Sequence, residues 1–171
     1  GGFLYTSDVM FDAMLMSKVG EMFARKFKAS GCEYVATIET KGIPAALFTA
    51  KALGVPLMVI RREAKVSEGS TMSINYFSGS SDRIQKMSVA RRAVKEGGKA
   101  IIIDDFMRAG GSVKGIADIL RESGMEVVGI GVVIAAETPV KKTISEYSSI
   151  LTLGEVDTEG NTIEIKSYSL D

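Results

Sequence analysis

Several residue types are scarce or missing in this 171-residue sequence, and each absence removes a class of chemistry. There is no histidine and only one cysteine, Cys32, which excludes disulfide frameworks, Cys/His zinc sites, Ser-His-Asp triads and Cys-His nucleophiles. Acid–base chemistry would fall to Asp, Glu, Lys or Tyr. Cys32 precedes an apolar segment, so we expect a small buried hydrophobe in a reducing compartment rather than a reactive thiol.

Net charge is absent as well, because 21 Lys and Arg residues balance 21 Asp and Glu residues. The chain as a whole is therefore not expected to bind nucleic acid or a membrane surface. No apolar run approaches the roughly 18 residues of a membrane helix, and the first residues do not resemble a signal peptide. We expect one cytoplasmic domain without a membrane partner. Because the sequence begins at Gly1 without Met, we also expect residues upstream.

What the sequence does contain is an alternation of helical and strand patterns. Apolar residues spaced by three and four predict helices, and short apolar runs rich in β-branched residues predict strands. The predicted helices are one from Val9 that ends near Gly31, 43–53 and 112–123, and the predicted strands are 34–38, 55–60, 100–104, 127–135, 150–153 and 162–168. Apolar strands joined through helices indicate an α/β domain with a doubly wound, mostly parallel sheet.

One long connection interrupts this pattern between Arg61 and Asp82. It is rich in charge, Ser and Thr, and we expect a flexible loop at about 63–82, although alternation in 71–76 hints at an exposed hairpin. The basic residues that follow could form a DNA-binding surface, but their interleaved acids favour a solvated helix face. These residues are Arg83, Lys86, Arg91, Arg92, Lys95 and Lys99.

The stretch AIIIDDFMRAGGS, residues 100–112, combines a buried strand, two acids and a small-residue turn. Gly110 and Gly111 let backbone N–H groups approach an anion, and Ser112 adds a hydroxyl where a helix begins. Asp104 and Asp105 accept hydrogen bonds from hydroxyls. A ribose phosphate fits both features, with its phosphate at the glycine turn and its hydroxyls at the two acids. The alternative is an acid pair that caps a helix, and the pattern matches neither the dinucleotide fingerprint nor the Walker loop.

Two other strand ends add cations. Thr40, Lys41 and Gly42 follow the strand at 34–38, and Arg61, Arg62 and Lys65 follow the strand at 55–60. Because parallel strands carry their ligands beyond their carboxyl ends, the loops after Ile38, Ile60 and Ile103 should converge. Together they predict a ribose phosphate at one end of a site and a second anion, such as pyrophosphate, at the other.

The segment IIIDDFMRAGGS resembles the phosphoribosyl pyrophosphate (PRPP) motif of type I phosphoribosyltransferases. The segments ETKGIPAALFTAKALGVPLMVIRREAKVSEGSTMSINYFSGSSDRIQKMS and GIGVVIAAE resemble the effector-binding domain of the purine operon repressors of Gram-positive bacteria. This resemblance spans residues 1–171. It implies a PRPP-binding regulatory domain with a type I phosphoribosyltransferase fold. The implied partners are PRPP, a second copy in a homodimer, and operator DNA bound through a winged helix-turn-helix domain upstream of Gly1.

The resemblance also implies roles for individual residues. Asp104 and Asp105 would hold the ribose hydroxyls, while Arg62 and Lys65 would add charge. The 63–82 loop would be a lid from which Tyr76 reaches toward the site. Two further sets would bind the anionic groups: Met107, Arg108, Ala109, Gly110, Gly111 and Ser112 for the 5′-phosphate, and Thr40, Lys41 and Gly42 for the pyrophosphate.

Arg108 decides between an enzyme and a sensor. Some type I transferases place an acid at this position, where it helps to deprotonate the base, but an arginine stays protonated and cannot act as a base. We therefore expect a PRPP sensor with no catalytic residue, no metal site of its own and no required cofactor, although Mg²⁺ could accompany PRPP. The alternative is a purine phosphoribosyltransferase of the adenine or xanthine type.

Overall fold

A six-stranded sheet forms the centre of the molecule. The computed structural model describes residues 6–63, 69–78, 83–139, 141–157 and 162–167. The strands run in the order β2-β1-β5-β6-β7-β8, parallel except for the last pair. Their bounds are β1 Tyr34–Ile38, β2 Leu57–Ile60, β5 Lys99–Met107, β6 Glu126–Ala136, β7 Ser148–Asp157 and β8 Thr162–Ser167. The predicted doubly wound, mostly parallel sheet is confirmed.

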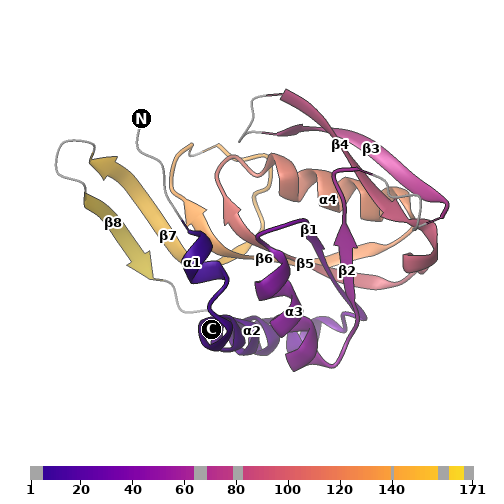
Figure 1. Cartoon of the computed structure of the whole chain (residues 1–171), viewed down its shortest axis with the longest axis horizontal. Helices are drawn as coiled ribbons and strands as arrows, with labels where there is room; N and C mark the ends of the chain where they lie inside the picture. The colour runs from indigo at the N-terminus through magenta and orange to yellow at the C-terminus, as the bar shows by residue number, and fades with distance from the viewer. Residues whose placement is uncertain (1–5, 64–68, 79–82, 140, 158–161, 168–171) are drawn as a thin grey trace.

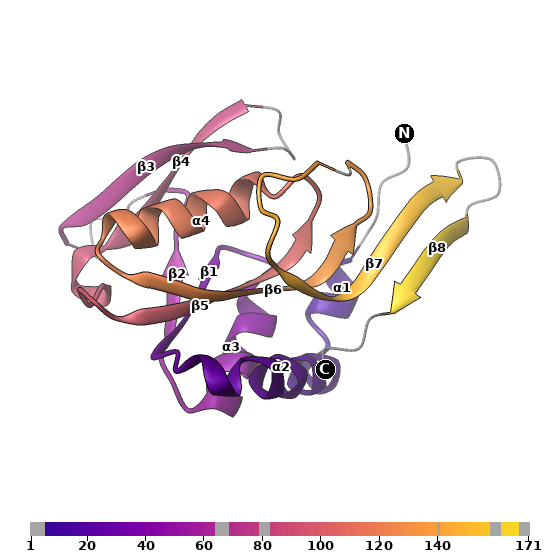
Figure 2. The ribbon, with the colours of Figure 1, turned by 180° about the vertical axis from the view of Figure 1, so that it is seen from behind.

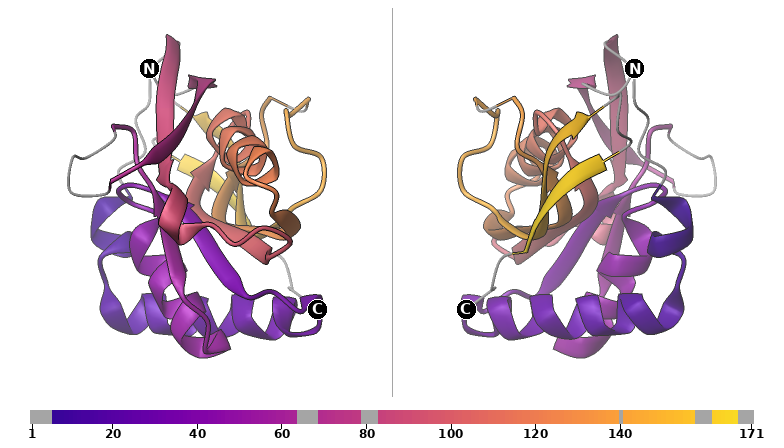
Figure 3. Two further views of the ribbon diagram at one scale, coloured as in Figure 1. Left: turned by 90° about the vertical axis from the view of Figure 1, so that its right-hand side faces the viewer. Right: turned by 90° about the vertical axis from the view of Figure 1, so that its left-hand side faces the viewer.

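Helices cover both faces of this sheet. Helices α2 (Ala13–Phe27) and α3 (Ile43–Leu53) lie on one face and α4 (Gly111–Glu122) on the other, as Figures 1 and 3 show. Each face has its own apolar core, because the central strands β1, β5 and β6 are buried on both sides. Helix α3 begins with Pro44 in its first turn and ends at Gly54, which is left-handed with φ 71°, so both predicted boundaries are confirmed.

The first predicted helix, from Val9 to near Gly31, is broken after Met10. Helix α1 spans Ser7–Met10, and α2 starts after Asp12, whose side chain accepts a hydrogen bond from the Leu15 N–H at 3.0 Å. A helix cap of this kind favours a new start at Ala13 over continuation. The 3-10 turn Lys28–Ser30 follows α2. Met10 and Met16 are fully buried, whereas 76% of Met14 is exposed.

The prediction of a loop at about 63–82 is wrong for residues 71–78, while the hint of a hairpin at 71–76 is confirmed. Residues Thr71–Ser78 form β3, which pairs antiparallel with β4 (Arg83–Ala90) in a separate two-stranded sheet beside α4. Tyr76, Met87 and Val89 are buried there, which explains why the alternation in 71–76 produced a strand. A Cβ added at Gly115 of α4 would lie 2.6 Å from the Met87 side chain, so this glycine allows the hairpin to pack closely.

The basic residues from Arg83 to Lys99 are not on a helix face. Arg83 and Lys86 lie on β4, and the short 3-10 helix Arg91–Ala93 follows. Lys95 pairs with Glu33 at 2.6 Å and Lys99 with Glu126 at 3.8 Å. Part of this charge is therefore neutralised by neighbouring acids. Among the described residues, no helix is long and apolar enough to cross a membrane.

Candidate functional site

The carboxyl ends of β1 and β2 are tied together by one acid. The two carboxylate oxygens of Glu39 accept hydrogen bonds from the Arg62 backbone N–H at 2.8 Å and from Arg61 Nη1 at 3.1 Å. The structure thus brings the first and second predicted loops side by side. Arg61, one of the cations expected at the second anion site, forms an ion pair with the Glu39 carboxylate.

The two adjacent acids belong to a strand rather than to a loop, because β5 continues to Met107. Asp104 is buried and Asp105 is half-buried; the Asp105 backbone N–H donates to Asp104 Oδ1 at 3.0 Å. Burial raises the pKa of the Asp104 carboxyl well above its usual range, and the neighbouring Asp105 charge raises it further, while the Arg62 charge opposes the rise. The fold therefore maintains an acid where ionisation is costly.

Gly42 joins the first loop to this acid. A Cβ added at Gly42 would lie 2.5 Å from Thr37 Oγ1 and 2.7 Å from Asp104 Oδ1, so only a residue without a side chain fits. The Thr37 hydroxyl is buried and has no hydrogen-bond partner among the described residues. Thr40 and Lys41 are exposed beyond it, and the Glu39–Thr40 peptide is cis. The end of the loop after β1 thus packs directly against Asp104 of β5.

The small-residue loop leads directly into α4. Met107 is buried in the core, so only its backbone is available to a ligand, and the exposed Arg108 side chain has no partner among the described residues. Gly110 is left-handed with φ 87°, and the first helical hydrogen bond runs from the Lys114 N–H to the Gly110 carbonyl. The N–H groups of the first helical turn, including those of Gly111 and Ser112, are left for a ligand.

Arg62 and Tyr76 meet at the edge of this site. Arg62 Nη1 donates to the Tyr76 hydroxyl at 3.1 Å and to Gln85 Oε1 at 2.8 Å, and the Tyr76 hydroxyl donates to Gln85 Oε1 at 2.9 Å. Tyr76 is 6% exposed, so this residue anchors the hairpin to Arg62 instead of extending from a lid. Lys65, the remaining predicted site residue, lies outside the described residues.

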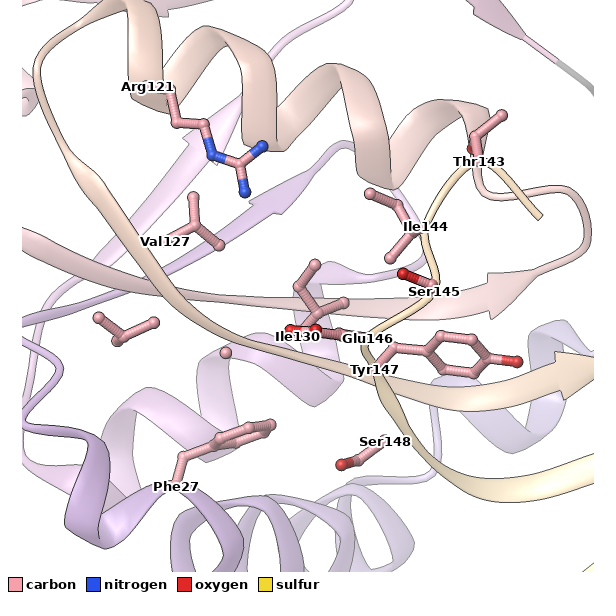
Figure 4. A pocket seen from close by; sticks show the side chains of 12 residues that line it. Phe27, Arg121, Val127, Ile130, Thr143, Ile144, Ser145, Glu146, Tyr147 and Ser148 are labelled. Atoms are coloured by element: carbon pink, nitrogen blue, oxygen red, sulfur yellow. The ribbon is translucent and has the colours of Figure 1, made fainter.

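A cavity lies elsewhere, along the first half of β6. It measures about 550 Å³ and is lined by Phe27, Arg121, Val127, Tyr147 and their neighbours, with Thr143 at one end (Figure 4). It contains none of the predicted site residues. The predicted site accordingly lies outside this cavity, at the edge of the sheet formed by the carboxyl ends of β1, β2 and β5.

The fold, the acid pair and the glycine loop before α4 can be compared with known proteins. Residues 15–168 match the family described as "Phosphoribosyl transferase domain". The chain belongs to this family. The resemblance of the PRPP motif to type I phosphoribosyltransferases is thereby confirmed, and so is the predicted type I fold.

Relatives of two kinds occur within this phosphoribosyl transferase domain family. The chain is 45% identical over 167 residues, 98% of its length, to the purine biosynthesis transcriptional repressor PurR of Bacillus subtilis. It is 35% identical over 124 residues, 72% of its length, to a xanthine phosphoribosyltransferase of Oenococcus oeni, of which it covers 60%. The chain spans 59% of the length of the Bacillus repressor.

Among solved structures, an adenine phosphoribosyltransferase from Thermoanaerobacter pseudethanolicus is similar in fold. The TM-score is 0.77, and the superposition covers 88% of this chain and 87% of the other at 23% sequence identity. At this identity the likeness establishes the phosphoribosyl transferase fold alone.

Sequence reasoning missed four residues that shape the site: Thr37, Glu39, Lys142 and Thr143. Glu39 carried a recognisable signal, since an acid at a strand end beside the cations of the next strand predicts a pair. Thr37 looks like an ordinary strand residue. Lys142 and Thr143 hydrogen-bond to carbonyls of the loop at 108–109 from 34 residues away, and no local pattern reports such a contact.

Proposed function

We propose that this chain is the PRPP-binding regulatory domain of a repressor of purine biosynthesis genes and that it does not catalyse phosphoribosyl transfer. The observation that carries the proposal is the extent of the two matches: the PurR repressor of Bacillus subtilis matches 98% of the chain, and the xanthine phosphoribosyltransferase matches 72%. A chain that matches this regulator over almost its whole length, and the enzyme over less of it, is best explained as a domain of a regulator.

In this proposal three groups of residues at the edge of the sheet bind different parts of PRPP. Asp104 and Asp105 accept hydrogen bonds from the ribose hydroxyls, and residues 107–112 with the start of α4 hold the 5′-phosphate. The exposed Thr40 and Lys41, with Gly42 and Arg62, hold the pyrophosphate, to which Lys65 adds charge. The carboxylates also fit a Mg²⁺ ion that arrives with PRPP and offsets its charge.

Arg108 supports the absence of catalysis. A guanidinium offers N–H donors and no acceptor, so Arg108 cannot take a proton from a purine nitrogen. Exposed beside the proposed phosphate site, it adds attraction for an anion instead. We propose that in the whole protein PRPP binding lowers the affinity of an upstream winged-helix domain for operator DNA. We also propose that the protein acts in the cytoplasm as a homodimer.

Calorimetric titration with PRPP in the presence of Mg²⁺ tests the ligand assignment. Wild-type chain should bind one PRPP, whereas Asp104→Ala and Asp105→Ala should abolish the heat of binding. Asp8→Ala is the matched control, since Asp8 is an exposed acid on α1, outside the site. Unchanged PRPP affinity in both strand-β5 variants would overturn the site.

One specific observation favours the second candidate, a purine phosphoribosyltransferase of the adenine or xanthine type. The curated relatives of this chain include a xanthine phosphoribosyltransferase at 35% identity. This candidate predicts release of pyrophosphate when the chain is mixed with PRPP and a purine. The proposal of a regulator predicts none.

A further inference from the structure

The loop proposed to hold the 5′-phosphate is fixed by a segment that follows β6. Figure 2 shows the connection between β6 and β7 rising beside the first turn of α4. From this connection the Lys142 ammonium donates three hydrogen bonds, to the carbonyls of Arg108 at 2.9 Å, Ala136 at 2.7 Å and Pro139 at 3.0 Å. A lysine has three N–H donors, so all of them are used.

The next residue holds the next carbonyl of the same loop. The backbone N–H and the hydroxyl of Thr143 both donate to the Ala109 carbonyl, at 2.8 and 2.9 Å. Thr143 Oγ1 also lies 3.0 Å from where a Cβ on Gly110 would stand. Two consecutive carbonyls of the loop, those of Arg108 and Ala109, are therefore held on one side by two consecutive residues.

Fixing these carbonyls also fixes the amides that follow them. In a trans peptide the C=O and the N–H of the next residue point in opposite directions. With the carbonyls of Arg108 and Ala109 directed toward Lys142 and Thr143, the N–H groups of Ala109 and Gly110 face the other way. They continue the row of free N–H groups at the start of α4, and such rows bind phosphate.

We propose that Lys142 and Thr143 are positioning residues for the 5′-phosphate of PRPP: they orient the amides of Ala109 and Gly110 without touching the ligand. This inference depends on the proposed function, which places the phosphate at this loop. None of the hydrogen bonds of Lys142 or Thr143 reaches residues 39–42. Their effect is thus confined to one half of the site.

Because the effect of Lys142 and Thr143 is expected at the 5′-phosphate half of the site alone, two ligands that each occupy one half can test it. Ribose 5-phosphate and inorganic pyrophosphate are titrated separately, by calorimetry, into wild-type chain, Lys142→Met and Thr143→Val. Lys142→Met should weaken ribose 5-phosphate about tenfold, the effect of losing one or two net hydrogen bonds, and leave pyrophosphate within about twofold. Thr143→Val keeps the backbone N–H and should weaken ribose 5-phosphate about threefold.

Lys141→Met is the matched control. Lys141 is the exposed neighbour with no side-chain partner among the described residues, and its replacement removes the same charge. Both probes should bind this variant within about twofold of wild type. Positioning by Lys142 is overturned if Lys142→Met binds ribose 5-phosphate as well as Lys141→Met does, or if it loses both probes equally.

The same titrations separate this inference from the proposed function. Wild-type chain that binds neither PRPP nor ribose 5-phosphate would overturn the proposed function, and this inference with it. Wild-type chain that binds both, together with an unaffected Lys142→Met, would overturn the positioning role alone.

Discussion

The two loops assigned to the phosphate groups of PRPP are held in different ways. The loop at 108–112 is fixed by hydrogen bonds from outside, through Lys142 and Thr143, and continues into a helix. The loop at 39–42 is held at its start by the hydrogen bonds of Glu39 to Arg61 and Arg62, and at its end by close packing, because Gly42 leaves no space for a Cβ against Thr37 and Asp104. One half of the site should therefore respond to lost hydrogen bonds, and the other to added volume.

The largest expected effect comes from adding volume at the packed loop. Gly42→Ala keeps an allowed backbone, since φ is −71°, but its methyl group would displace the Asp104 carboxylate or the loop itself. PRPP affinity should fall about 100-fold, as displacements of about 1 Å do in preorganised sites. Calorimetry with PRPP and with pyrophosphate measures it. Lys41→Ala removes only an exposed charge and should cost less; a smaller loss for Gly42→Ala than for Lys41→Ala would refute the packing argument.

The next effect is on stability and depends on pH. Burial raises the pKa of the Asp104 carboxyl in the folded chain above its value in the unfolded chain. Wild-type chain therefore loses stability as pH rises from about 4 toward the raised pKa, and Asp104→Asn does not. In urea unfolding, Asp104→Asn should be more stable than wild type by about 1 to 3 kcal/mol at pH 8, with almost no difference near pH 4.

The control for this pH dependence is Asp8→Asn, which alters an exposed carboxyl. Its stability should follow that of wild type at both pH values. A difference between Asp104→Asn and wild type that stays constant from pH 4 to pH 8 would contradict a raised pKa at Asp104.

A smaller effect tests the cation shared by the packed loop and the hairpin. Arg62→Met removes a charge near Asp104 and two hydrogen bonds, and should weaken pyrophosphate binding about tenfold. Tyr76→Phe removes only one of those hydrogen bonds, and we expect a change of about twofold. Equal losses in the two variants, measured by calorimetry, would mean that Arg62 serves the hairpin and not the anion.

The smallest effect concerns the buried Thr37 hydroxyl. It has no partner among the described residues, so Thr37→Val should change the free energy of unfolding by less than about 1 kcal/mol. Thr49→Val, which removes the hydrogen bond from Thr49 Oγ1 to the Ala45 carbonyl at 2.8 Å, should cost more. The reverse order in thermal or urea unfolding would show that Thr37 has a partner in solution.

The fold could be predicted from the sequence because its signals are local. Tyr34–Ile38 and Ile43–Leu53 agree with the predicted bounds, since a β-rich run and a Pro-to-Gly helix frame define them without help from the rest of the chain. The error at Thr71–Ser78 has the opposite origin. Loop-like composition predicted a flexible segment, but a buried Tyr76 under Gly115 stabilises a strand, and that contact crosses 39 positions of sequence.

The location of the site could be predicted from the sequence, but its detailed structure could not. The acids, glycines and cations at three strand ends could be assigned to one edge, because a parallel sheet forces such loops together. The sequence does not predict which of these residues are available to a ligand. Arg61 is paired with Glu39, Met107 is in the core, and the supports of the 108–112 loop come from residues 142 and 143, so these facts follow from tertiary packing alone.

The central claim, that this chain holds PRPP without transferring its phosphoribosyl group, can be tested in one measurement. The chain is mixed with PRPP, Mg²⁺ and, in turn, adenine, guanine, hypoxanthine and xanthine, and both bound PRPP and released pyrophosphate are followed. The account predicts saturable binding of one PRPP per chain and no pyrophosphate. Pyrophosphate release at ordinary enzyme rates, about 1 per second or faster, would contradict it.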